Sequence, residues 1–358
     1  MNITLNEIFY FMGITQSDGG FMVFVRGRKP VLKPLYKVTS KTNTNTLPEF
    51  RDFLTRMGVY SGTDEGVPSN SATRERGRGP SIRIQSLNSI LKIRSVYRKA
   101  WYDVTGVNTP LLANKQRDFV LTLLMCSNRT LSKAEKMDLR HTLHKEKYTD
   151  PDLPSNVQTK SRAEHEEILN IVGKSAGAAK NIVESVENTL KPADPTKIPC
   201  DFWLGLLDGD GGFHVGCRPR YNDSRTYISY LEFSIYVTLT LELSSKSVFR
   251  DFEKAVGLRP SRIRDFRDTS GQNAYQIQIR DANEVKKLIK FIDGCGGLRG
   301  DVRKADYELM KETQNLREQG LLKKSFRGNR AYQHEVMDKL LKKILQGRED
   351  RIVDVNAH

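Results

Sequence analysis

Two aspartates, Asp18 and Asp210, occupy equivalent places in two similar stretches of the sequence, 210 − 18 = 192 residues apart. Each ends an apolar run in which small residues stand four positions apart: Gly13 and Ser17 in the first run, Gly205 and Gly209 in the second. This spacing predicts a helix whose small residues share one face, so that another helix backbone can approach closely. Two glycines follow each aspartate, and we expect them to form a left-handed turn that ends the helix.

These two carboxylates could do metal chemistry if the two helices pack through their small faces. Asp18 and Asp210 would then meet, and their charges would repel each other unless cations bridged them. Oxygen ligands favour Mg²⁺ over softer metals, and such a site suits phosphodiester hydrolysis. The alternative is that both acids only end helices within a bundle. A carboxylate at a helix C-terminus has the unfavourable sign for helix stability, which favours the metal site.

The similarity of the two halves extends beyond these stretches. Residues 50–53, 84–85 and 115–119 reappear in the same order as residues 249–252, 277–278 and 303–307. The offsets are 249 − 50 = 199, 277 − 84 = 193 and 303 − 115 = 188. Offsets that drift around a common value indicate one ancestral unit that has been duplicated and has acquired loop insertions. The sequence therefore predicts two related structural units in one chain.

Both stretches resemble the LAGLIDADG motif, and the chain is similar to the two-repeat, monomeric LAGLIDADG homing endonucleases. The second stretch, 203–213, matches the motif closely. In the first, 11–21, Gln16 stands where the motif has its earlier acid and Thr15 replaces an aliphatic residue. The resemblance implies that the later acids, Asp18 and Asp210, are the catalytic metal ligands. The implied metal is Mg²⁺, with Mn²⁺ as a substitute.

The resemblance implies an α+β fold, in which two pseudo-symmetric αββαββα repeats form a saddle over double-stranded DNA. We place repeat 1 at 1–120, a helical insertion and linker at 121–199, repeat 2 at 200–320 and a basic C-terminal tail at 321–358. Within repeat 1 we expect a helix at 7–18, strands at 21–28 and 34–41, a helix at 47–57, strands flanking a loop at 61–80, and helices from 88. A capping box at 132–135 and the composition of 163–190 predict helices in the insertion.

Strand parity selects the side chains that would face the DNA. Residues 231–241 alternate between apolar and polar, which predicts a strand with one face on the core. The same alternation, counted from each aspartate and along the neighbouring strands, gives an outward set: Arg26, Arg28, Lys37, Arg83, Gln85, Arg218, Arg220, Tyr236, Gln276 and Gln278. Arginine can read guanine in the major groove or bind phosphate. The alternative for any one of them is an ordinary solvated strand face.

The resemblance also implies a basic residue that reaches the scissile phosphate from just before the helix that follows each sheet. Lys115 occupies that neighbourhood in repeat 1, and Arg303 or Lys304 in repeat 2. The family's polar, water-positioning residue would lie near the end of the second strand of each repeat, where Ser40 and Glu242 are the candidates.

The composition agrees with a nucleic-acid partner. The chain of 358 residues has 58 Lys and Arg against 43 Asp and Glu, a formal net charge of +15. Its four cysteines have no paired spacing and predict reduced thiols in an intracellular protein. No apolar run approaches membrane-spanning length. The first predicted helix begins so early that we expect the protein to act where it is made, in an organelle or in a phage or bacterial cytoplasm.

Two rival functions use the same fold. An intron maturase would bind group I intron RNA as a splicing cofactor, with or without cleavage. The long basic insertion and the Lys-rich tail leave room for that function. A transcriptional regulator would use the saddle only to bind DNA. The retained Asp18 and Asp210 favour sequence-specific cleavage of a long asymmetric target by an enzyme that a mobile intron or intein-like element encodes.

Overall fold

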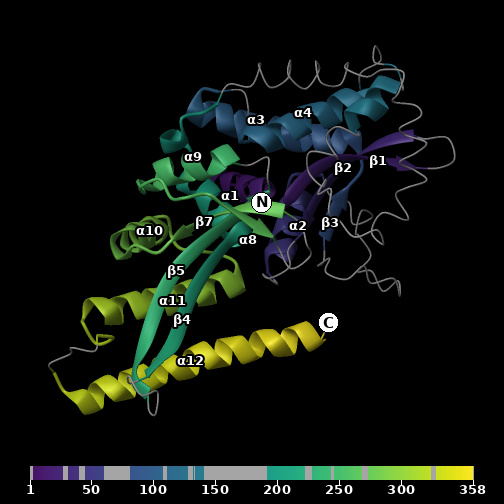
Figure 1. Cartoon of the computed structure of the whole chain (residues 1–358). Helices are drawn as coiled ribbons and strands as arrows, with labels where there is room; N and C mark the ends of the chain where they lie inside the picture. The colour runs from purple at the N-terminus through teal and green to yellow at the C-terminus, as the bar shows by residue number, and fades with distance from the viewer. Residues whose placement is uncertain are drawn as a thin grey trace.

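The computed structural model describes residues 3–26, 31–39, 45–59, 81–107, 111–127, 132, 134–140, 192–221, 228–242, 246–267, 273–323 and 328–357. Two antiparallel sheets, each covered by helices, flank a central pair of helices (Figure 1). This is the expected α+β fold.

The first repeat runs in the predicted order of helices and strands. Its elements are α1 (Leu5–Ser17), β1 (Gly19–Arg26), β2 (Val31–Thr39), α2 (Thr46–Arg56), β3 (Ser81–Ile84), α3 (Leu87–Thr105) and α4 (Ala113–Ser127). The strand order in the sheet is β1-β2-β3. The loop at 61–80 and the strand expected before it lie outside the described residues, as does the helix expected at 163–190.

The second repeat follows the same order. Its elements are the 3-10 helix η1 (Pro195–Lys197), α8 (Cys200–Asp210), β4 (Gly211–Tyr221), β5 (Ile228–Glu242), α9 (Lys246–Val256), β6 (Arg264–Arg267), β7 (Asn273–Ile279), α10 (Ala282–Gly294) and α11 (Asp301–Glu318). The strand order is β4-β5-β7-β6, and α12 (Arg330–Ala357) follows the repeat. Figure 1 shows α10 and α11 beside the long β4–β5 hairpin and α12 crossing its far end.

The two motif helices, α1 and α8, pack backbone against backbone through their glycines. A Cβ atom on Gly13 would overlap the carbonyl oxygen of Phe202, and one on Gly205 would overlap that of Tyr10. A Cβ atom on Gly209 would likewise overlap the Ser17 hydroxyl. Larger side chains at these positions would therefore separate the helices. The predicted small-residue contact is confirmed.

The turn predicted after each motif helix is wrong. None of the glycines that follow Asp18 and Asp210 has a positive φ, and Gly211 is extended, with φ −75° and ψ 149°. The need for glycine is steric instead. A Cβ atom on Gly19 would lie 2.5 Å from the carbonyl oxygen of Thr15, and one on Gly211 would overlap that of Leu207. The strand leaves the helix too closely for any side chain to fit.

Aromatic contacts confirm how the two repeats align. In repeat 1 the rings of Phe21 and Phe119 stack with centroids 4.3 Å apart. In repeat 2 the corresponding rings, Phe213 and Tyr307, have centroids 5.5 Å apart. Each pair fixes the helix after the sheet against the first strand of its own repeat. Lys115 and Arg303, each four residues before its ring, are therefore equivalent.

Two of the predicted boundaries differ from the structure. The boundary at 120 falls within α4, whose Leu121 and Met125 pack with Val23 of β1. The insertion begins only after this helix, and its helix at 134–140 adds Leu139 to the same cluster. The tail from 321 is attached to repeat 2, because α12 packs its Leu340 and Ile344 on Phe233 of β5. Within the described ranges, no helix is both long enough and apolar enough to cross a membrane.

Candidate active site

The two motif aspartates meet where α1 and α8 end. Asp18 is the C-cap of α1 and Asp210 is the last residue of α8, and both are partly buried. Burial and the neighbouring Asp18 carboxylate raise the pKa of Asp210 well above its ordinary value, while Lys115 and Arg303 oppose that rise. A buried acid whose proton affinity is raised by a second carboxylate beside it forms, together with that carboxylate, a site that favours a cation. The structure thus brings together the two residues that the sequence singled out.

Lys115 reaches this site from the first turn of α4 and is almost completely buried, at 4% exposed. Its ammonium group donates to the carbonyl oxygen of Gly19 at 2.6 Å and lies 3.3 Å from Oε1 of Glu242. Glu242 ends β5 in the other repeat and also contributes to raising the pKa of Asp210. A basic side chain of repeat 1 therefore shares an ion pair with an acid of repeat 2 beside the aspartates.

The geometry separates the two candidates for the basic residue of repeat 2. Arg303 is partly buried and lies close enough to Asp210 to lower its pKa, whereas Lys304 is exposed. Arg303 is also the residue that aligns with Lys115. Arg303 is therefore the better candidate for the basic residue of repeat 2. Ser40, the repeat-1 candidate for positioning water, lies outside the described residues.

Gln16, the departure from the motif in the first repeat, has the same structural role as Asp208. Its Oε1 accepts a hydrogen bond at 3.0 Å from the backbone N–H of Leu112, just before α4. Asp208 accepts one at 2.9 Å from the backbone N–H of Arg299, just before α11. Either oxygen fixes the segment that leads to the basic residue, Lys115 or Arg303. The role requires an acceptor and no charge, so the glutamine does not disrupt the first half-site.

The outward strand faces carry most of the set chosen by parity. Lys37 of β2 lies directly opposite Arg83 of β3 in the sheet, while Ile82 and Ile84 of β3 face the core. Gln85, which follows β3, is exposed. In repeat 2, Gln276 donates to Thr240 at 2.9 Å on the outward side, and Gln278 pairs with Thr238.

Tyr236 lies on the outward face of β5, opposite His214 of β4. Its ring stacks on His214 with centroids 4.6 Å apart, and Arg280 lies 5.4 Å above it. Nε2 of His214 is 3.0 Å from the Thr238 hydroxyl. The sequence indicated the face for these side chains and did not predict that they form one stacked group.

The four strand arginines have different outcomes. Arg218 and Arg220 are exposed on β4, and Arg220 donates from Nε to Glu232 of β5 at 2.6 Å. One predicted DNA contact is therefore already paired with an acid on the same face. Arg26 ends β1 opposite Val31, and its side chain is not among those described. Arg28 lies outside the described residues.

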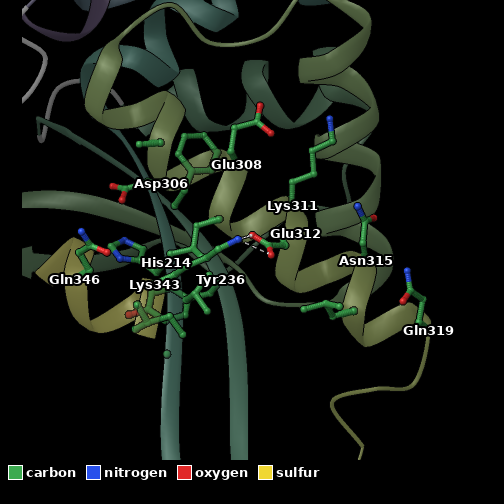
Figure 2. Close-up of a pocket in the computed structure, with 17 residues that line it drawn as sticks. His214, Tyr236, Asp306, Glu308, Lys311, Glu312, Asn315, Gln319, Lys343 and Gln346 are labelled. Carbon is green, nitrogen blue, oxygen red and sulfur yellow. Dashed lines mark hydrogen bonds and ion pairs between the residues drawn. The ribbon is translucent and has the colours of Figure 1, made fainter. Parts of the chain in front are cut away.

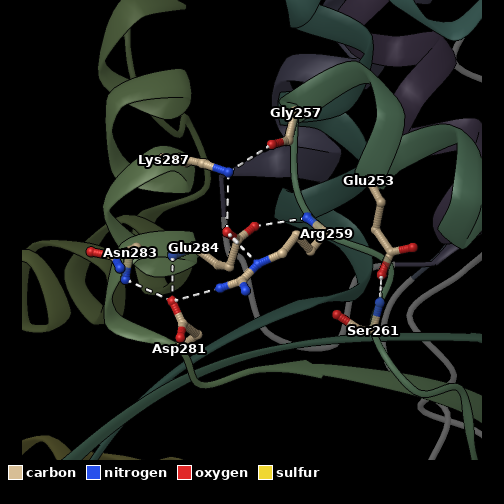
Figure 3. Close-up of polar contacts among 8 residues, drawn as sticks. All are labelled: Glu253, Gly257, Arg259, Ser261, Asp281, Asn283, Glu284 and Lys287. Carbon is tan, nitrogen blue, oxygen red and sulfur yellow. Dashed lines mark hydrogen bonds and ion pairs between the residues drawn. The ribbon is translucent and has the colours of Figure 1, made fainter.

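Arg264 is an outward residue that the parity argument missed. It pairs with Gln276, which itself pairs with Thr240, so the three side chains form one row across the sheet. β6 is only four residues long, too short for its alternation to be recognised in the sequence. The segment before it is held by Glu284 of α10 (Figure 3), whose carboxylate accepts from the Arg259 backbone N–H at 2.8 Å and forms an ion pair with the Arg259 side chain at 3.2 Å.

A groove of ~800 Å³ between β4, α11 and α12 lies elsewhere on repeat 2 (Figure 2). Its lining includes His214 and Tyr236 but neither motif aspartate. An ion pair between Lys343 and Glu312, at 2.7 Å, joins α12 to α11 across it. Because its lining mixes acidic and basic side chains, the groove has no single charge character that would select a ligand. The chemistry is therefore better assigned to the aspartates.

The aspartate pair fits a divalent cation shared with a substrate. Within the described part of the chain there is no group of three or more His, Cys, Asp or Glu side chains that could hold a metal. Two carboxylates alone leave coordination positions for water and phosphate oxygens, as Mg²⁺ sites on phosphate substrates usually do. The charge repulsion that raises the pKa of Asp210 is what a bound cation would relieve. The donor set therefore suits Mg²⁺ better than a structural metal.

Comparison with known proteins agrees with this architecture. No protein-family model and no curated protein matches the sequence. Among solved structures, the I-LtrWI LAGLIDADG homing endonuclease bound to target DNA matches with a TM-score of 0.56 and 13% identity, over 96% of each chain. The LAGLIDADG meganuclease I-CpaMI bound to uncleaved DNA matches with a TM-score of 0.55 and 13% identity, over 95% of this chain and 97% of that one.

A third structure, I-SmaMI bound to uncleaved DNA target in the presence of calcium ions, matches with a TM-score of 0.53 and 15% identity. The alignment covers 97% of this chain and 98% of I-SmaMI. These alignments span both repeats and the helices at the aspartates. The chain therefore has the two-repeat fold of the LAGLIDADG homing endonucleases.

Proposed function

We propose that the protein is a homing endonuclease that makes a double-strand break at a long, asymmetric DNA site. The observation that carries the proposal is the meeting of Asp18 and Asp210 where the two repeats join, each repeat having its own sheet and its own basic side chain beside the acids. The solved relatives by fold, which are described as homing endonucleases bound to DNA, support the same function. We further propose that an intron or a similar mobile element encodes the protein.

Asp18 and Asp210 would hold Mg²⁺ together with oxygens of the scissile phosphates, with Mn²⁺ as a substitute. The bound metal would polarise the phosphate and lower the pKa of a water molecule. Lys115 and Arg303 stand beside the acids, one in each repeat, where each would stabilise the charge that develops on one scissile phosphate. Because the repeats are pseudo-symmetric, one half-site would serve each strand of the duplex.

The outward strand faces would recognise the DNA. Lys37, Arg83 and Gln85 would contact one half of the target. Arg218, Tyr236, Gln276, Gln278 and the newly identified Arg264 would contact the other. Side chains that differ between the two repeats would read different base pairs, so the target would be asymmetric. The excess of positive charge would bring the protein to DNA before any sequence is read.

Cleavage of a plasmid that carries the intron-free form of the host gene tests the proposal. We expect linear DNA with Mg²⁺ and none with EDTA. Asp210→Asn should lose cleavage, whereas Asp103→Asn, an exposed acid on α3, should retain it. Specific DNA binding with no cleavage under any divalent metal would favour a regulator. Specific binding of the intron RNA without cleavage would favour a maturase.

A further inference from the structure

Helix α11, which carries Arg303 in its first turn, begins at a residue that cannot cap it. Its N-cap is Gly300, which has no side chain to accept a hydrogen bond from the first helical N–H groups. Such groups need a partner when they are removed from water. Asp301 satisfies one of them locally, because its Oδ1 accepts from the Val302 N–H at 2.9 Å. The N–H of Asp301 itself needs an acceptor from elsewhere.

Asn45 of the first repeat supplies that acceptor. Its Oδ1 accepts from the Asp301 N–H at 3.1 Å, and its Nδ2 donates to the carbonyl oxygen of Arg299 at 2.9 Å. One amide group therefore holds the backbone on both sides of Gly300. Asn45 is also the N-cap of α2, a position where asparagine usually caps its own helix, yet its side chain makes no such bond there. It caps a helix of the other repeat instead.

Arg299, the residue before Gly300, makes three further contacts. The guanidinium of Arg299 lies 4.2 Å above the Tyr10 ring and donates to Asp201 at 2.7 Å, and its backbone N–H donates to Asp208. These contacts fix Arg299 against α1 and α8, the helices that carry the aspartates. They do not hold residue 301, where α11 starts. The Asn45 side chain joins the two sides of that start.

We propose that Asn45 is a positioning residue for cleavage. By capping α11 from the other repeat, it fixes the direction of that helix and so the place of Arg303 beside Asp210. The inference rests on the proposed endonuclease function for its effect on cleavage, but its structural part does not. Its effect is confined to one half-site, because Asn45 binds the start of α11, whereas Lys115 is carried by α4.

Hydrogen exchange tests the structural part without DNA. In Asn45→Ala, we expect the backbone amides at the start of α11 to exchange about three- to tenfold faster, the ratio that the loss of one hydrogen bond produces. The matched control is Ser86→Ala, which removes the side-chain cap of α3, where Ser86 accepts from Ser89. It should leave α11 unchanged. Equal exchange at α11 in wild type and Asn45→Ala would overturn the proposal.

Single-turnover cleavage of the intron-free plasmid tests the functional part. We expect Asn45→Ala to slow the cutting of one strand about three- to tenfold, so that nicked circular plasmid accumulates before linear DNA. In an Arg303→Gln background, adding Asn45→Ala should cause no further loss, because the two changes act through one group. Equal slowing of both strands, or a full additional loss in that background, would show a general effect on the fold and overturn the positioning role.

The outcomes keep the two hypotheses apart. If the wild-type protein cuts and Asn45→Ala cuts with the same strand ratio as Ser86→Ala, the positioning role is lost and the endonuclease function stands. If the wild-type protein does not cut DNA, the endonuclease function is lost. Hydrogen exchange at α11 then still decides whether Asn45 holds that helix.

Discussion

The ammonium nitrogen of Lys115 lies 3.3 Å from Oε1 of Glu242, so an ion pair joins the two repeats beside the motif aspartates. The lysine is buried, while 30% of the glutamate side chain is exposed. Each partner belongs to a different repeat, so their contact depends on how the repeats sit against each other. The pair therefore links the packing of α1 on α8 to the charge state of the site.

Removing the acid of this pair should cost more stability than removing the base. In Glu242→Gln the buried Lys115 loses the carboxylate 3.3 Å from its ammonium group, although it keeps the Gly19 carbonyl oxygen and the charge of Asp210, and weakening the pairing of a buried charge is unfavourable. In Lys115→Met the glutamate that remains is partly hydrated. We expect Glu242→Gln to lower the free energy of unfolding by about 1–3 kcal/mol, and Lys115→Met by less. Urea denaturation measures both, and the reverse order would contradict the assignment of burial.

The motif aspartates should be needed for cleavage and not for binding. Asp18→Asn and Asp210→Asn each remove a proposed metal ligand, and neither side chain lies on the outward strand faces. We expect no linear plasmid from either variant, with binding affinity within about threefold of wild type. Gel mobility shift in Ca²⁺ measures binding separately from cleavage. Linearisation at the wild-type rate by either variant would exclude that aspartate from the active site.

Freeing Arg220 from its acid should strengthen DNA binding. Glu232 pairs with Arg220 on the outward face and would also repel phosphate. Both side chains are about half exposed, so the ion pair itself contributes little to stability. We expect Glu232→Gln to tighten binding about three- to tenfold at low salt and to steepen the salt dependence.

The control for that change is Glu335→Gln, which removes the acid of a more exposed pair with Lys339 on α12. It should leave binding almost unchanged. If Glu232→Gln does not tighten binding, or tightens it equally in an Arg220→Gln background, Arg220 does not contact the DNA.

Much of this architecture could be predicted from sequence because its signals are local. The four-residue spacing of Gly205 and Gly209 predicted the helix contact, and the alternation over 231–241 predicted which face of β5 is buried. The alignment of repeat 1 with repeat 2 followed from the shared order of their motifs. These patterns need only neighbouring residues and the periods of helix and strand.

The contacts that connect distant segments could not be predicted in this way. Gln16 looked like a defect of the motif until its partner, the backbone of Leu112, was seen 96 residues away. Asn45 caps a helix 256 residues away, and Glu242 acquires a role only through Lys115 of the other repeat. The pairing of Arg220 with Glu232 could not be inferred from strand register either, because Glu232 lies directly opposite Arg218 and Arg220 lies opposite Tyr230.

The equivalent acids Asp52 and Asp251 should respond differently to neutralisation. Asp52 is 64% exposed and pairs with Arg56 at 2.8 Å. Asp251 of α9 is less exposed, and burial raises its pKa from 3.8 to about 6, although Lys254 opposes the rise. The folded state therefore binds more protons than the unfolded state between these two values. The free energy of unfolding falls as the pH rises through that window, and the penalty remains in full above it.

Asp251→Asn should therefore stabilise the protein at neutral pH. We expect a gain of about 1–2 kcal/mol at pH 7.5, less than the full linkage value because the carboxylate is partly hydrated. The gain should shrink as the pH falls below about 6 and vanish near pH 4, where Asp251 is neutral in the folded state. The matched control, Asp52→Asn, loses a surface ion pair and should be neutral or slightly destabilising. Thermal unfolding from pH 4 to pH 7.5 measures both variants. A pH-independent difference between Asp251→Asn and wild type would show that the carboxylate is not desolvated by α9 packing.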